Sequence, residues 1–60
     1  MIDPDEKVVQ CKARPLIAQH GAGAAQVAID WLNESIDRQD WYERDVWARV
    51  VRAIHEQLAS

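Results

Sequence analysis

Residues 40–58 read DWYERDVWARVVRAIHEQL, and this stretch decides the fold. Asp40 can cap the free amides of a new helix, and Glu43 stands three residues later, where its carboxylate can reach back to the cap. Apolar side chains then recur at the spacing of one helical face: Trp47, Val50, Val51, Ile54 and Leu58. A cap followed at once by an apolar stripe predicts a helix over residues 41–59.

Another helix is expected near the N-terminus, at about residues 4–20. It begins with Asp3 as the cap and Pro4 at the first helical position, and it ends before Gly21. Its apolar face comprises Val9, Ala13, Leu16, Ile17 and His20. Pro15 falls inside this pattern, where a proline removes a backbone hydrogen bond and crowds the preceding turn. We therefore expect the helix to be kinked or broken at Pro15.

A third helix is expected between these two, over residues 23–37, after the turn Gly21–Gly23. Its apolar residues cover more than half of the helix circumference: Ala24, Ala25, Val27, Ala28, Trp31, Leu32 and Ile36. A helix with so wide an apolar arc usually contacts two neighbours. The sequence therefore predicts an all-α chain, folded as a single three-helix domain over residues 1–60.

The length and charge of the chain restrict its class of function. A chain of 60 residues buries only about 60% of the surface that it exposes when unfolded. With a single cysteine it has no internal disulfide, so it must pack its helices well or share apolar surface with another copy or another protein. Ten acidic and seven basic side chains give a net charge of -3, which opposes nonspecific attraction to nucleic acid and anionic lipid.

The chain is expected to be cytoplasmic. Its N-terminus lacks the basic start and the continuous apolar run of a signal peptide, and no stretch approaches the roughly 18 apolar residues of a membrane span. The lone Cys11 fits a reducing compartment. We therefore expect no membrane contact.

One set of residues carries a family resemblance. It comprises Leu16-Ile17 before His20-Gly21, the small residues Ala24 and Ala28, Asp40 seven positions before Trp47, and then Val50 and Ala53-Ile54. With these residues the chain, from about Ala13 to Leu58, resembles a family of short, uncharacterised bacterial helical proteins. Gln39-Asp40 stands where that family usually has Gly-Asp, and Pro15 is a further departure. The resemblance implies a helical fold and no activity, because the family has no assigned function.

The side chains that carry chemistry form no recognisable motif. Cys11, His20 and His55 are the candidates for a Cys/His metal cluster, but structural zinc sites use closely spaced ligand pairs that this sequence lacks. Catalysis needs a nucleophile with a positioned base, or carboxylates in a cleft, and three short helices form little cleft. We therefore expect a non-catalytic protein with no cofactor and no metal.

The aromatic residues offer the best candidate site. Trp31 and Trp47 are expected to anchor the core. A second, weaker apolar line starts at the beginning of the last helix, with Trp41, Tyr42, Val46 and Ala53, and Arg49 beside it. Aromatic and arginine side chains around an apolar strip are typical of interface hot spots. We predict that a partner binds at Trp41, Tyr42, Val46 and Arg49, although the same line could instead pack on the first helix.

The sequence therefore predicts a protein-interaction module, which forms a homodimer or is an accessory subunit of a larger complex. The alternative is a small acidic inhibitor or antitoxin-like regulator that occupies the nucleic-acid site of an enzyme or defence complex. The surface that would mimic the charge of the nucleic acid, its mimic face, comprises Asp30, Glu34 and Asp37.

Direct nucleic-acid binding is the third option, with Lys7, Lys12 and Arg14 as its candidate residues. The arginines of the last helix do not add to this patch, because acidic residues are interleaved with them.

Overall fold

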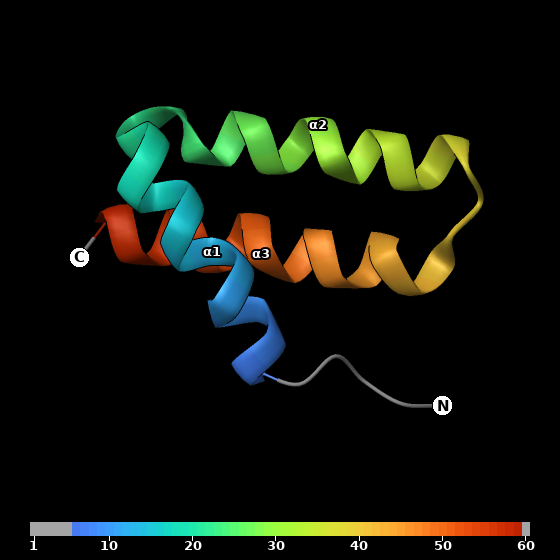
Figure 1. Ribbon diagram of the computed structural model, residues 1–60, viewed down its shortest axis with the longest axis horizontal. Coiled ribbons are helices and arrows are strands. Elements are labelled where there is room, and N and C mark those ends of the chain that lie inside the picture. The colour runs from blue at the N-terminus through green and yellow to red at the C-terminus, as the bar shows by residue number, and fades with distance from the viewer. Residues whose placement is uncertain (1–5, 60) are drawn as a thin grey trace.

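The computed structural model describes residues 6–59 of the chain, and these residues are helical throughout apart from one short joint (Figure 1). The elements in order are α1 (Glu6–His20), the 3-10 turn η1 (Gly21–Gly23), α2 (Ala24–Asp37) and α3 (Trp41–Ala59). The described part contains no strand, so the all-α prediction is confirmed. The expected cap at Asp3 and Pro4 lies outside the described residues.

The division into three helices is less clear than predicted. No non-helical residue separates α1, η1 and α2, so they can also be described as one long helical stretch that bends at η1 (Figure 1). Gly21 permits the bend because its φ of 53° lies in the left-handed region, which favours glycine. This stretch packs against α3.

Pro15 does not break α1, so the prediction of a break there is wrong. The helix runs from Glu6 to His20 with the proline inside it, and the structure shows no kink at Pro15. A proline at this position removes the amide that would bond to the carbonyl of Cys11. Because Cys11 is exposed, water can bond to that carbonyl instead, which lowers the cost of the missing bond.

The joint between α2 and α3 is a Schellman turn with glutamine in the place of glycine. The amide of Gln39 donates to the carbonyl of Ile36 at 3.0 Å, and the amide of Asp40 donates to the carbonyl of Ser35 at 2.9 Å. Gln39 has a φ of 59°, so it adopts the left-handed conformation that this turn requires. The joint therefore has the form of a Gly-Asp turn although its sequence is Gln-Asp.

Asp40 caps α3 as predicted, because its Oδ1 accepts a hydrogen bond from the amide of Glu43 at 3.2 Å. The other hydrogen bond of the expected capping box, from the amide of Asp40 to the Glu43 carboxylate, is wrong. The amide of Asp40 is already donated to the carbonyl of Ser35 in the turn, so it is not available for the Glu43 carboxylate.

The core is built from small side chains. Its fully buried apolar residues are Val9, Ala13, Ala24, Ala28, Val46, Val50 and Ile54. Leu16, Ile17, Trp47 and Val51 are only partly buried around them. Four residues of the predicted apolar faces are exposed: His20, Trp31, Ile36 and Leu58.

The buried face of α3 is rotated about the helix axis, relative to the predicted apolar stripe, towards the side that carries Val46. Val46, Val50 and Ile54 follow one another at intervals of four residues and are fully buried, whereas Leu58, at the far end of the predicted stripe, is exposed. The reason is the position of α1, which crosses α3 obliquely in front of its C-terminal half (Figure 1). A hydrogen bond of 2.9 Å from Gln57 Nε2 to Gln10 Oε1 joins the two helices there.

The α2–α3 pair forms an antiparallel hairpin that α1 crosses only at the end away from the joint (Figure 1). No helix within residues 6–59 is both long and apolar enough to cross a membrane.

Candidate protein-binding site

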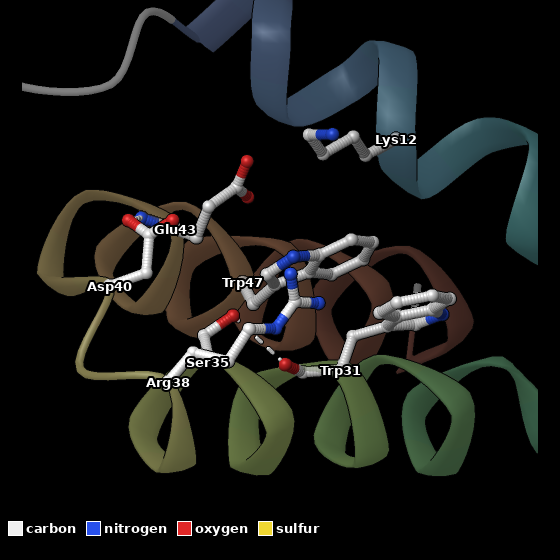
Figure 2. Close-up of a pocket in the computed structure, with 7 residues that line it drawn as sticks. All are labelled: Lys12, Trp31, Ser35, Arg38, Asp40, Glu43 and Trp47. Carbon is white, nitrogen blue, oxygen red and sulfur yellow. Dashed lines mark hydrogen bonds between the residues drawn. The ribbon is translucent and has the colours of Figure 1, made fainter.

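A hollow of about 250 Å³ opens among the three helices, next to the α2–α3 joint (Figure 2). In this view α3 lies behind the hollow, with α1 on one side and α2 on the other. The residues that line it are Lys12, Trp31, Ser35, Arg38, Asp40, Glu43 and Trp47. We call this hollow the tryptophan trough.

Two stacked indoles form the apolar part of the trough. The ring centroids of Trp31 and Trp47 are 5.8 Å apart and their planes differ by 14°, which is an offset-stacked arrangement. Trp47 is partly buried against the core, but Trp31 remains exposed. The prediction that both rings anchor the core is therefore wrong for Trp31, which contributes to a surface instead.

Lys12 extends over the tryptophan pair from α1. Its Nζ lies 5.1 Å from the centroid of the Trp47 ring, within the range of a cation–π interaction. The contact ties α1 to α3 at the edge of the trough. It also gives Lys12 a role other than the nucleic-acid contact that the sequence left open for it.

Ser35 is the buried polar residue of the trough, and sequence reasoning did not find it. Its Oγ donates a 3.0 Å hydrogen bond to the carbonyl of Trp31, four residues earlier, so the hydroxyl is satisfied inside α2. The carbonyl of Ser35 accepts the amide of Asp40 in the Schellman turn. Ser35 thus links the backbone beneath Trp31 to the joint.

The charged side chains of the trough have both signs. Asp40 and Glu43 lie towards one end, and Lys12 and Trp31 lie towards the other (Figure 2). Arg38 lies between them and pairs with Glu34 of the outer α2 face, with 3.4 Å between Arg38 Nε and Glu34 Oε1. Both partners of that pair are mostly exposed, so it adds little to stability.

The predicted binding strip on α3 is only partly present. Trp41, Tyr42 and Arg49 are exposed, and the guanidinium carbon of Arg44 lies 5.5 Å from the Trp41 ring centroid. Val46 is fully buried, so its assignment to an exposed strip is wrong. Its side chain belongs to the core because residue 46 shares a helical face with Val50.

The three acidic residues of the proposed mimic face, Asp30, Glu34 and Asp37, are all exposed on α2. One of them has a cationic neighbour that offsets its charge, because Arg38 pairs with Glu34, whereas Asp30 accepts a hydrogen bond of 3.2 Å from the uncharged Gln26.

The three basic residues of the first helix do not form one patch. Lys7 and Arg14 line a shallow hollow on the outer side of α1 together with Cys11 and Pro15, whereas Lys12 lines the trough. Cys11, His20 and His55 are exposed, and residues 6–59 contain no group of three or more His, Cys, Asp or Glu side chains placed to hold a metal ion.

No family model, curated protein or solved structure matches this chain. The resemblance to short bacterial helical proteins therefore stays a prediction.

Proposed function

We propose that the chain is a compact, cytoplasmic three-helix domain that acts as a non-catalytic protein-interaction module, by self-association or as an accessory subunit of a larger complex. One observation carries this proposal. The fully buried core consists of alanines, valines and one isoleucine, whereas three of the four aromatic side chains stay about half exposed. The exposed fractions are 47% for Trp31, 55% for Trp41 and 52% for Tyr42.

The size of this exposed aromatic surface supports a binding role. Each such ring buries about 150–250 Å² when it is fully covered, so covering the exposed half of one ring contributes about 2–3 kcal/mol. The entire folding stability of a domain of this length is only about 3–9 kcal/mol. Covering all three half-exposed rings would therefore contribute about as much free energy as the folding of the whole domain. A protein partner is the ordinary means of covering such rings, which are enriched at interface hot spots.

The acidic-regulator alternative ranks second. Its support is the placement of Asp30, Glu34 and Asp37 on the exposed surface of one helix. The neighbouring Arg38 weakens the negative field that such mimicry needs. Nucleic-acid binding ranks third, because the basic residues of α1 are divided between two hollows.

Photo-crosslinking in the host cell tests the proposal. A photoreactive phenylalanine analogue replaces Tyr42 in one variant and Trp31 in another, and a matched control carries it at Asn33, an exposed polar position of α2. We expect a discrete protein adduct at position 42, position 31 or both, and none at position 33. The adduct mass identifies self-association if it is twice that of the chain and a foreign partner otherwise. No adduct above the control at either aromatic position would refute the interaction module.

A further inference from the structure

We propose that the tryptophan trough docks a basic segment of a foreign protein, with an apolar or aromatic side chain of that segment on Trp31 and its lysine or arginine side chains at Glu43 and Asp40. This inference rests on the proposed function and names the chemistry of its partner. It also names the surface, which is the trough and not the strip at Trp41 and Tyr42.

The apolar end of the trough is ordered before any partner binds. Trp31 stacks on Trp47 with an angle of 14° between the ring planes, yet Trp31 is 47% exposed. A ring that is already held in place loses little side-chain freedom on association, so more of its burial contributes to affinity. Lys12 lies at the same end (Figure 2), so this end repels a cation of the partner and suits an apolar side chain.

The carboxylates at the other end of the trough have unused bonding capacity, whereas both cations already have interactions. Lys12 Nζ lies over an indole ring, and Arg38 pairs with a carboxylate on the outer face of α2. Asp40 accepts one hydrogen bond, from the amide of Glu43. The partly buried Glu43 carboxylate has no hydrogen bond or ion pair to any residue between 6 and 59. The trough therefore offers acceptors, which lysine and arginine donors complement.

The charge of the surrounding half of the molecule selects a basic partner. Residues 30–45, which form the half of the hairpin next to the joint, contain six acidic and two basic side chains, a formal charge of -4. The other described residues, 6–29 and 46–59, contain two acidic and five basic side chains, a formal charge of +3. So strong a separation of charge attracts a cationic segment to the half that holds the trough.

A second copy of this chain supplies few cations for the purpose. Arg52 pairs with Glu56 at 3.3 Å, and Lys12 lies over an indole ring. Lys7 and Arg49 also take part in interactions of their own. Contact between the basic half of one copy and the acidic half of the next would be head-to-tail, and such contacts continue into open filaments unless they close in a ring. A basic segment of another protein meets neither obstacle.

Selection from a random peptide library displayed on phage tests the proposal, with the full chain as the immobilised target. We expect the enriched peptides to combine lysine or arginine with an aromatic or large aliphatic side chain. One enriched peptide is then synthesised with a fluorescent label. Its dissociation constant is measured by fluorescence anisotropy with the wild type and with variants of the chain.

Variants with the same change of charge locate the binding site. Glu43→Lys should raise the dissociation constant about tenfold, because a carboxylate in contact with the peptide becomes a cation. The matched control Asp37→Lys, at an exposed position of α2 outside the trough, should raise it less than about threefold, through the long-range field alone.

Two milder variants keep the test independent of the charge reversal. Glu43→Gln, which removes the charge and keeps the shape, should raise the dissociation constant about threefold. Trp31→Ala should raise it about tenfold or more, as expected for an interface hot spot. Circular dichroism confirms that each variant retains its helices.

The failures of this inference and of the proposed function are distinguishable. Enriched peptides that are acidic or neutral, a library that yields no peptide, or equal effects of Glu43→Lys and Asp37→Lys overturn the basic segment in the trough. Self-association in sedimentation that is lost with Glu43→Lys overturns the foreign partner and assigns the trough to a second copy. In each of these cases a crosslinked adduct at Tyr42 or Trp31 would still support the interaction module.

Discussion

Replacement of Gln39 by glycine should stabilise the fold. Gln39 occupies the position after α2 at which the backbone turns left-handed, with a φ of 59°. A residue with a β-carbon has a steric cost there of about 1–2 kcal/mol, because the β-carbon approaches its own carbonyl oxygen. The Gln39 side chain is exposed, so its removal costs little packing.

The expected gain is the difference between two terms. Glycine removes the steric cost, but it loses more conformational freedom on folding, by about 0.5–1 kcal/mol. With the middle of each range, the net stabilisation of Gln39→Gly is about 0.5–1 kcal/mol. In a domain of this length, 1 kcal/mol shifts the melting temperature by about 4–8 °C, so we expect a rise of about 2–8 °C.

Thermal and urea unfolding, followed by circular dichroism at one fixed protein concentration, measure this gain. Gln39→Ala is the control, because it removes the same side chain but keeps the β-carbon and hence the strain. If the glycine variant is no more stable than the alanine variant, the left-handed turn at Gln39 is not a source of strain and the reasoning is refuted.

Two further predictions concern the other turn and the core. Gly21→Ala should lower the unfolding free energy by about 1 kcal/mol, because φ is 53° there although the space around an added β-carbon is open. Gly23→Ala, at a φ of -83°, should leave stability unchanged or raise it by up to about 1 kcal/mol, and equal losses at both positions in urea titrations would contradict this. Val46→Asp should abolish the helical circular dichroism because it buries a charge, whereas Tyr42→Ser should retain it; a folded Val46→Asp variant would return residue 46 to the surface strip.

The helices were predictable wherever the signal is local. The bounds of α3 agree with the prediction, and α2 begins one residue later than expected. The Asp40 cap and the turn at Gly21 depend on side-chain and backbone chemistry within a few residues, which the sequence states directly. The turn at Gln39 was harder to predict, because a glutamine does not by itself indicate a left-handed residue.

The rotation of α3 about its axis was not predictable in the same way. Apolar residues lie on both flanks of this helix, with Val46 on one side and Leu58 on the other. Which flank is buried depends on where α1 crosses, and no local pattern encodes that crossing. The tryptophan trough was missed for the same reason, since it joins residues of all three helices.

The exposed aromatic surface follows from this topology. A helix of the length of α1 spans about 22 Å and α3 about 28 Å, so α1 could cover most of the hairpin only by running along it. The three-residue η1 instead directs α1 obliquely across the end of the hairpin away from the joint. The half next to the joint keeps Trp31 and Trp47 stacked on each other, and Lys12 lies over the Trp47 ring. A chain with one more helix would cover this half internally, and we propose that a bound protein does so here.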